Sequence, residues 1–331
     1  MKPITANLRP GNLVEVLSAG EILRTLDSNG TVDKLPFMPE MMEYCGKQFR
    51  VSKRVVKTCY YGTSSGMRKF PAEDVVLLEG LRCSGAEHDG CQKACTIFWR
   101  EAWLRKADGP SAVKSSEDPE NVVRLRARLK TSTGPKTYFC QASEILNSTV
   151  PLSRWERFGK SVSDIRAGNT GILEMAKLIS IWLFWRIRRI VLGPYCHGGK
   201  GPTPVASLNL RPGERIEIKP LTSISETLDE RAHNRGLYFT PLMGLSCGEK
   251  HQVKDKIEKI IVDGTGEMRQ LRNTVFLEGS LCGCACVAFG GCPRGEFAYW
   301  REIWLSRSTA GTWTSAERPE EEKPDPLRDI A

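Results

Sequence analysis

The residues best suited to chemistry in this sequence are thiols and one imidazole in a short segment. Cys83, His88, Cys91 and Cys95 follow the spacing Cys-x4-His-x2-Cys-x3-Cys. Cysteine thiolates and a histidine nitrogen are the ligands of closed, tetrahedral zinc sites. Cys45 precedes a glycine in an earlier loop, and we expect it to reach the same ion. The sequence therefore predicts a zinc site from Cys45, Cys83, His88 and Cys91, with Cys95 as the competing fourth ligand.

The chain repeats itself about 200 residues further on. The segment 8–11 returns at 210–213, the segment 99–104 returns at 300–305, and matching segments stay 199 to 202 residues apart. Chance does not hold such an offset over nearly a hundred residues, and a period of this size indicates a duplicated domain.

The second copy keeps most of the thiols but lacks the histidine. Cys247 matches Cys45, Cys282 matches Cys83, and Cys292 matches Cys91, while Cys284 or Cys286 could replace His88. We therefore expect a second zinc site, with an iron–sulfur cluster as the alternative. Two thiols outside these loops, Cys59 and Cys140, are expected to be inert buried residues.

The elements that must position these loops are mostly short strands. Alternating or β-branched segments at 11–17, 49–60, 75–78 and 97–104 predict strands, and Ser18 could cap a short helix that runs to Asp27. We expect a mainly β (α+β) fold of tandem SH3-like barrels, each with a Cys-rich metal site. The expected divisions are repeat 1 at 1–106, a linker and helical insert at 107–207, repeat 2 at 208–307, and a disordered acidic tail at 308–331.

The insert contains one long apolar helix, expected at 171–192. Its middle is apolar nearly all round and its end is basic. Such a helix is typically buried, and burial between the repeats is our expectation, with a peripheral membrane contact or a partner groove as open alternatives. The longest uncharged apolar run has eight residues, whereas a membrane span needs about 20, so no transmembrane helix is predicted.

Composition restricts the protein class further. The chain has 331 residues, about two domains by length, and its 40% hydrophobic content excludes a wholly disordered chain. The N-terminus shows no apolar signal segment. We therefore expect a cytoplasmic protein with reduced thiols, in which clustered cysteines bind metal rather than form disulfides.

The net charge of +9 raises the question of nucleic-acid binding. A basic run includes Arg50, Lys53, Arg54 and Lys57, which could contact phosphates from one strand pair. The matching region of the second copy is diluted by acids. Nucleic-acid binding is therefore a secondary hypothesis.

A duplicated Trp-Arg-Glu-x-Trp-Leu motif closes each repeat. On a strand, Trp99, Glu101 and Trp103 would share one face, and the tryptophans would fill the core or line a pocket. Glu101 and its counterpart Glu302 would then point inward, where they could orient a metal-bound histidine or bind a ligand amine.

Three segments resemble a family of bacterial hypothetical proteins that contain two Cys-rich repeats. These are Cys45-Gly46-Lys47, the stretch from Leu78 to Cys91, and Trp300 to Leu305. Members of that family are encoded near polysaccharide or specialised-metabolite biosynthesis genes, and the resemblance implies no particular activity. The family's Cys-x4-His-x2-Cys loop is similar to residues 83–91 here, whereas the second repeat departs from it by lacking the histidine.

No nucleotide-binding glycine motif, nucleophile elbow or His-Glu-x-x-His is present. We therefore expect a zinc-stabilised binding or scaffold protein with a protein partner, accessory to a polysaccharide or specialised-metabolite biosynthetic complex. A zinc- or thiol-dependent enzyme of the same pathway is the first alternative, and a nucleic-acid-binding regulator is the second.

Overall fold

The computed structural model describes residues 7–60, 66–107, 109, 118–193, 195–283 and 288–308. The chain divides into two compact units. The first comprises Met1–Phe184, Lys259–Gln270 and Val287–Gly295, and the second comprises Trp185–Glu258, Leu271–Cys286 and Glu296–Ala331. Two stretches of the second sequence repeat therefore belong to the first unit, so the compact units do not coincide with the repeats.

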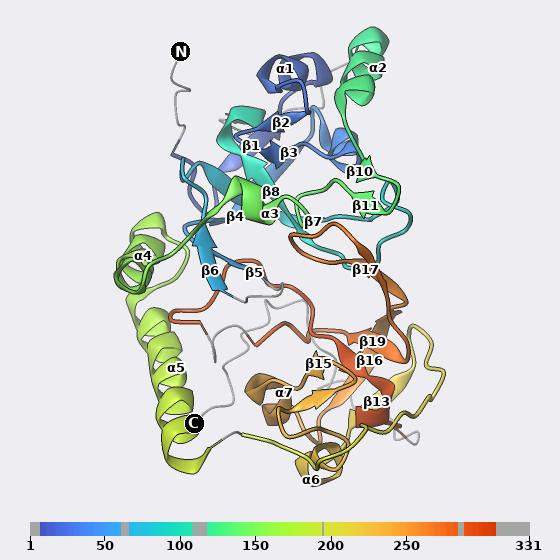
Figure 1. The fold of residues 1–331 in the computed structure, drawn as a ribbon. Helices are drawn as coiled ribbons and strands as arrows, with labels where there is room; N and C mark the ends of the chain where they lie inside the picture. Colours follow the sequence, from blue (N-terminus) through green and yellow to red (C-terminus); the bar gives the residue numbers. More distant parts are fainter. Residues whose placement is uncertain are drawn as a thin grey trace. The chain divides into compact units, whose positions relative to one another are not determined.

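A five-stranded antiparallel sheet organises the first unit (Figure 1). Its order is β8-β7-β4-β1-β9. The bounds of these strands are Leu13–Val16 (β1), Gln48–Arg54 (β4), Val75–Arg82 (β7), Thr96–Arg100 (β8) and Leu104–Lys106 (β9). Val14 and Val16 on β1 are fully buried, whereas the residues that alternate with them are half-exposed, as expected of a strand with one face on a core.

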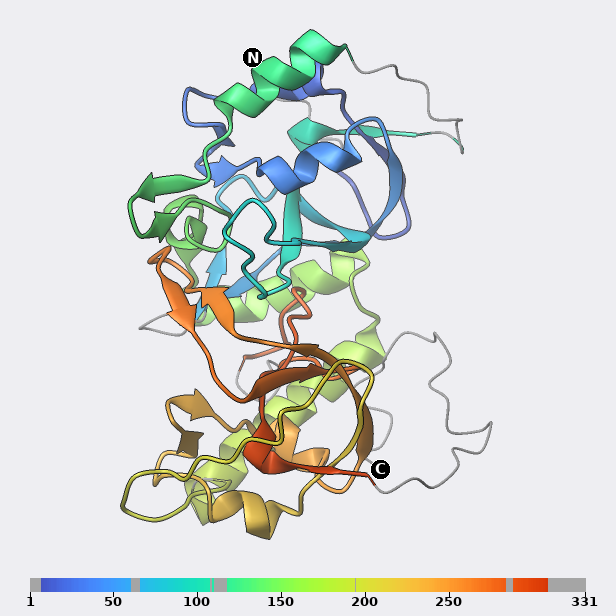
Figure 2. The ribbon, with the colours of Figure 1, turned by 90° about the vertical axis from the view of Figure 1, so that its right-hand side faces the viewer.

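Smaller strand pairs surround this sheet. They are β2 (Thr31–Val32) with β3 (Leu35–Pro36), β10 (Ser132–Gly134) with β11 (Thr137–Tyr138), β17 (Lys259–Ile261) with β18 (Met268–Gln270), and the trio β5 (Thr58–Tyr60), β6 (Gly66–Lys69) and β12 (Val150–Pro151). Figure 2 shows β17–β18 beside β10–β11, where an antiparallel bridge joins Thr137 to Glu267.

Helices cover the first unit. They are α1 (Ala19–Thr25), α2 (Pro119–Arg128), α3 (Ile145–Ser148), α4 (Arg154–Ala167) and the long α5 (Ile172–Leu192), with 3-10 turns η1 (Pro39–Tyr44) and η2 (Glu101–Trp103). Ser18 caps α1, as the sequence predicts, in a capping box with Glu21, and the helix ends at Thr25 rather than at Asp27. Asp118 and Ser153 accept backbone hydrogen bonds at the starts of α2 and α4. The helix α5 runs from the first unit into the second.

The second unit contains a sheet of corresponding order, β20-β19-β16-β13-β21. Its strands are β13 (Arg215–Ile218), β16 (Lys250–Lys256), β19 (Thr274–Leu277), β20 (Trp300–Arg301) and β21 (Leu305–Arg307). The unit also contains the pair β14 (His233–Asn234) and β15 (Leu237–Tyr238), helices α6 (Leu221–Ser225) and α7 (Pro241–Leu245), and the 3-10 turn η3 (Glu302–Trp304).

The two sheets also correspond in register. Leu13 faces Arg50 in one and Arg215 faces Gln252 in the other, which is the offset of 202 seen in the sequence. The fold is thus mixed α/β with mostly antiparallel strands and a curled, half-barrel sheet. The SH3-like barrel assignment stays a prediction. The described part of the chain has more helix than a mainly β fold implies.

The duplicated tryptophans lie in the two cores. Trp99 and Trp103 are fully buried in the first unit, as Trp300 and Trp304 are in the second, which confirms the prediction that they fill the core. The prediction of one strand over 97–104 was wrong, because η2 interrupts it between β8 and β9.

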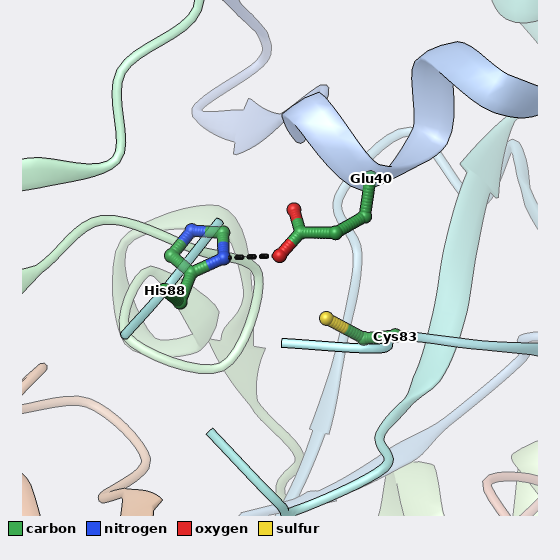
Figure 3. A group of neighbouring side chains, drawn as sticks. All are labelled: Glu40, Cys83 and His88. Carbon is green, nitrogen blue, oxygen red and sulfur yellow. Dashed lines mark hydrogen bonds and ion pairs between the residues drawn. The ribbon is translucent and has the colours of Figure 1, made fainter. Parts of the chain in front are cut away.

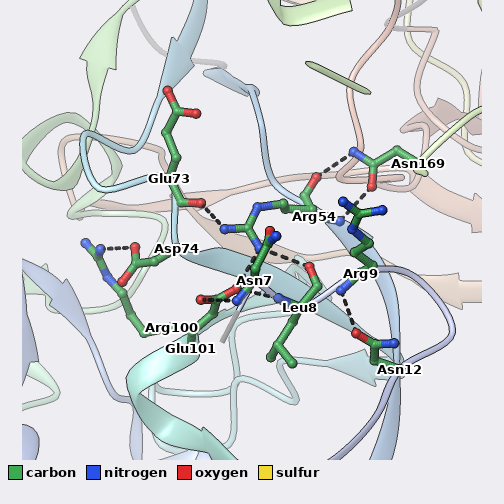
Figure 4. A network of polar contacts seen from close by, with 10 residues as sticks. All are labelled: Asn7, Leu8, Arg9, Asn12, Arg54, Glu73, Asp74, Arg100, Glu101 and Asn169. Carbon is green, nitrogen blue, oxygen red and sulfur yellow. Dashed lines mark hydrogen bonds and ion pairs between the residues drawn. The ribbon is translucent and has the colours of Figure 1, made fainter. Parts of the chain in front are cut away.

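The glutamate of each motif anchors backbone. Glu101 accepts hydrogen bonds from the Leu8 N–H at 2.8 Å and from the Arg54 guanidinium at 2.6 Å (Figure 4). Glu302 accepts from the N–H groups of residues 208, 209 and 210. Both therefore tie the start of a repeat to its end. The hypothesis that they orient a metal ligand or bind an amine does not agree with these contacts.

Within the described residues, no helix has the length and apolar content to cross a membrane. The acidic tail predicted at 308–331 lies outside the described residues, apart from Ser308.

Candidate metal centre

The Cys-rich loop between β7 and β8 folds back on itself. The Cys83 N–H donates to the Cys95 carbonyl at 2.8 Å, which closes the loop at its base. Gly85 has a φ of +69°, and a Cβ at this position would lie 1.9 Å from the Cys91 carbonyl oxygen. Only glycine tolerates both conditions. Gly85 thus permits the close approach of the two ends of the Cys83–Cys91 segment.

A buried ion pair stands beside this loop (Figure 3). Glu40, on η1, accepts a hydrogen bond from Nδ1 of His88 through Oε1 at 2.6 Å. The other ring nitrogen, Nε2, donates to the Phe139 carbonyl at 3.0 Å. A carbonyl can only accept, so Nε2 carries hydrogen; with Glu40 as a carboxylate, Nδ1 carries one as well and the ring is an imidazolium.

The electrostatics of this pair agree with that protonation state. Burial works against protonation of His88, but the hydrogen bond and charge of Glu40, with the Phe139 carbonyl, outweigh burial and raise the pKa of His88. Burial also raises the pKa of Glu40, but its bond to His88 outweighs burial and lowers that pKa. Both shifts favour the ionised pair, in which neither ring nitrogen offers a lone pair to a metal.

Four thiols line one small cavity next to His88. They belong to Cys83, Cys91 and Cys95 of the loop and to Cys140, which precedes α3. Cys91 and Cys140 are buried, whereas Cys83 and Cys95 are half-buried. The remaining wall includes Met38, Ala142 and Ile261. The cavity thus combines an apolar wall with the side chains that bind soft metal ions.

Backbone N–H groups point at three of these sulfurs. Ile261 donates to Sγ of Cys91 at 3.3 Å. Burial raises the pKa of Cys140 to about 11, although the N–H groups of Ser143 and Ala142 oppose the rise. Burial and the Glu40 charge likewise raise the pKa of Cys83, against the Gly85 N–H. Donors aimed at a sulfur stabilise its thiolate, which is the form a metal binds.

The tightest group of metal-binding side chains is Glu40, Cys83 and His88. Among the described residues, only these bring three ligand atoms within 4.8 Å of one another. The second carboxylate oxygen of Glu40, Oε2, is buried without a hydrogen-bond partner. An unpaired buried carboxylate oxygen is costly, so this atom marks a place where a cation would lower the energy.

The structure changes the predicted first ligand set. Cys83, His88, Cys91 and Cys95 do border one cavity, but Cys45 does not line it. Cys45 instead follows η1, where its N–H donates to the Met42 carbonyl. Cys140, expected to be inert, lines this cavity instead. No spacing pattern connects Cys140 to the loop, since 45 residues separate it from Cys95.

The residues of the second predicted set are divided between the two units, and the second zinc site stays a prediction. Cys292 lies in the first unit, and its sulfur is 3.2 Å from that of Cys59. Cys247 and Cys282 belong to the second unit, where burial and the neighbouring Cys196 raise the pKa of Cys247 to about 11. Cys284 and Cys286 lie outside the described residues.

Two of the four basic residues proposed for nucleic acid pair with groups of the fold itself. Lys57 is 2% exposed and contacts Asp164 at 3.0 Å. Arg54 donates to Glu101 and to two carbonyls. Arg50 and Lys53 are exposed, although Arg50 donates to the Gly11 carbonyl. The basic run does not form a continuous cationic face.

Comparisons with models of protein families, with curated proteins and with solved structures gave no match.

Proposed function

We propose that the first unit binds one zinc ion through the thiolates of Cys83, Cys91, Cys95 and Cys140, and that the chain is a zinc-stabilised binding or scaffold protein. The observation that carries this proposal is the single cavity lined by all four thiols. A set of four cysteines is a common ligand set of closed structural zinc sites.

The choice of ligands follows from the hydrogen bonds. Both ring nitrogens of His88 already have partners, the Glu40 carboxylate and the Phe139 carbonyl, so His88 could bind zinc only after giving up one of them. The thiols of Cys83, Cys91 and Cys140 already receive backbone N–H groups. Cys95 borders the same cavity and would be the fourth ligand. Zinc would have to draw the sulfurs closer, because among the described residues no three of them lie within 4.8 Å of one another. His88 and Glu40 then act beside the site, as a buried ion pair that fixes the loop against η1.

A structural role is favoured over a catalytic one by the state of the thiols. A reactive cysteine needs a lowered pKa, but burial and the Glu40 charge raise the pKa of Cys83. The His88 nitrogen that does not face Glu40 faces a carbonyl rather than a thiol, so it is not arranged as a base for one. Four protein ligands also leave no position on zinc for a substrate.

The site would stabilise the unit rather than perform a reaction. The loop and the segment around Cys140 come from separate parts of the chain, and the ion would cross-link them. The Glu40–His88 pair ties the loop to η1. Zinc binding to such sites contributes on the order of 10 kcal/mol to folding. The rigid unit could then present its surface to a protein partner of a biosynthetic complex.

Elemental analysis tests this assignment. Protein expressed with added zinc should contain zinc, and Cys83→Ser and Cys140→Ser should each lose one ion per chain relative to the wild type. Cys196→Ser is the matched control, because Cys196 is also a buried thiol but belongs to the second unit and contacts Ser225. It should keep the full zinc content.

Alkylation of the intact protein provides a second measurement that does not depend on the folding of a variant. Cys83, Cys91, Cys95 and Cys140 should be protected from iodoacetamide in the wild type and become reactive together when a chelator is added. A wild-type protein without zinc, or a Cys140→Ser variant with unchanged zinc, would overturn the proposal. Iron with acid-labile sulfide in place of zinc would overturn it as well.

A further inference from the structure

The arginine of the duplicated Trp-Arg-Glu-x-Trp-Leu motif has different partners in the two units. In the first unit, Arg100 is fully buried, and its guanidinium meets the carboxylates of Asp74 at 2.5 Å and Asp33 at 3.2 Å. Figure 4 shows the contact with Asp74. A charged group inside a protein needs such partners, because an uncompensated buried charge is costly. The corresponding arginine of the second unit is Arg301.

An amide replaces the first of these two acids in the second unit. The Glu101 N–H donates to the Asp74 carbonyl at 2.8 Å. The Glu302 N–H donates in the same way to the Asn273 carbonyl at 2.9 Å. Asn273 therefore occupies the position of Asp74 but carries no charge.

A base replaces the second acid. Arg100 donates to the Asp33 carbonyl at 3.4 Å, in the turn between β2 and β3. Arg301 donates to the Arg235 carbonyl at 3.2 Å, in the turn between β14 and β15. The two turn residues share one backbone conformation, with φ of +46° for Asp33 and +47° for Arg235. Arg235 therefore stands where the first unit has a carboxylate.

The change of charge extends to the neighbouring positions. The first unit has three acids and two bases here, which are Asp33, Lys34, Glu73, Asp74 and Arg100. The second unit has three bases and no acid, in the order Arg235, Gly236, Arg272, Asn273 and Arg301. Arg235 and Arg272 are exposed, and Arg301 is half-buried. The second copy therefore carries a local excess of positive charge that the first copy lacks.

The guanidinium of Arg301 has only neutral partners. Nη1 donates to the Arg272 carbonyl at 2.8 Å and to the Thr274 hydroxyl at 2.9 Å, and Nη2 donates to the Arg235 carbonyl. Within the part of the chain that the structure describes, no carboxylate pairs with Arg301. Burial, and then the charge of Arg235, lower the pKa of Arg301. Nη2 carries two hydrogens, so one of them is left for a further acceptor.

We propose that Arg235 and Arg301 bind a phosphate group, which supplies the negative charge that Asp33 and Asp74 supply in the first unit. Guanidinium groups match the geometry of phosphate oxygens and bind them through paired hydrogen bonds. A phosphate monoester carries about −1.5 to −2 charges at pH 7, so it balances two arginines where one carboxylate would not. The ligand class is a phosphorylated small molecule or free phosphate. The site goes beyond the zinc-stabilised scaffold, because all its residues belong to the second unit.

Calorimetric titration of the full-length chain with inorganic phosphate, at fixed ionic strength in chloride, tests the proposal. The wild type should bind phosphate, and Arg235→Asp should weaken binding about tenfold or more, because it removes a charged donor and places a carboxylate beside Arg301. The variant should fold, since Asp33 already adopts this backbone conformation in the first unit. Without phosphate, it should unfold at a higher urea concentration than the wild type, because Arg301 gains an ion-pair partner.

Lys250→Asp is the matched control. Lys250 is an exposed base on β16, two strands away from β20, and its replacement changes the net charge by the same amount. This variant should bind phosphate like the wild type, and both variants should keep their zinc, which separates this test from that of the metal site. A wild type that does not bind phosphate, or an Arg235→Asp variant that binds it equally well, would overturn the proposal. Equal weakening by Lys250→Asp would reduce the effect to general charge attraction, and acetate binding as tight as phosphate binding would overturn the choice of ligand.

Discussion

The duplicated glutamate offers a sharp test of how each repeat is held together. In the second unit the Glu302 carboxylate accepts the N–H groups of Leu208 at 2.6 Å, Asn209 at 2.9 Å and Leu210 at 3.2 Å. Its side chain is fully buried. Glu302→Gln keeps the shape of the side chain but removes its charge and replaces one acceptor oxygen by a donor NH2 group.

The magnitude follows from those contacts. Hydrogen bonds to a charged group contribute about 1.5–3 kcal/mol each. The amide would retain its oxygen toward Leu208 and Asn209, with weaker neutral bonds, and would place NH2 against the Leu210 N–H. The loss is then one charged bond plus part of two others. We expect Glu302→Gln to lower the free energy of unfolding of the second unit by about 3 kcal/mol.

Urea denaturation followed by tryptophan fluorescence measures this change, because Trp300 and Trp304 are buried in the same unit. Glu278→Gln is the control, since Glu278 meets Lys254 at the surface with its side chain 48% exposed, and it should change stability by less than about 0.5 kcal/mol. A change in Glu302→Gln as small as that of the control would refute the anchoring role. Loss of zinc from Glu302→Gln without loss of stability would instead restore the ligand-orienting hypothesis.

Three further predictions concern the first unit. Gly85→Ala should sharply reduce the zinc content in elemental analysis, because the new Cβ would collide with the Cys91 carbonyl oxygen. Gly90→Ala is the control and should retain zinc, because its Cβ would come no closer than 3.5 Å to Cε of Lys259. Equal zinc contents in the two variants would contradict this. Glu40→Gln and His88→Gln should each lower the free energy of unfolding of the first unit by about 3–5 kcal/mol. A double-mutant cycle measured by urea denaturation should show a coupling energy between Glu40 and His88 above about 1 kcal/mol, and additive effects would refute the ion pair. For Asp27, burial raises the pKa, but accepted hydrogen bonds outweigh burial and lower it below 3.8. The ionised Asp27 carboxylate therefore stabilises the fold above its unfolded pKa of about 3.9, and this contribution is lost as the pH falls through the lowered pKa of the folded state. Asp27→Asn should reduce the free energy of unfolding at pH 7 but not at low pH. An equal loss at both pH values would contradict this.

Much of the local structure could be predicted because it depends on neighbouring residues. The alternation at 11–17 gave a strand that the structure places at Leu13–Val16, and the long apolar helix expected at 171–192 is Ile172–Leu192. The strand at 97–104 could not be predicted correctly, because a 3-10 turn begins at Glu101 and its side chain accepts a hydrogen bond from the N–H of Leu8, 93 residues away. Alternation alone carries no information about such a distant partner.

The candidate site shows the same limit. Cys83, Cys91 and Cys95 could be assigned to one site from their spacing, because a single loop carries them. Cys140 and Glu40 could not be assigned, since they come from segments that only tertiary packing brings to that loop. The role of His88 also depended on both of its hydrogen-bond partners, neither of which the sequence indicates.

X-ray absorption at the zinc edge of the purified wild-type protein tests the central claim most directly. The account predicts a shell of four sulfur ligands at about 2.3 Å and no nitrogen or oxygen ligand. A scatterer at about 2.0–2.1 Å, as histidine or carboxylate ligands give, would contradict the four-thiolate site and the assignment of His88 and Glu40 to an ion pair beside it.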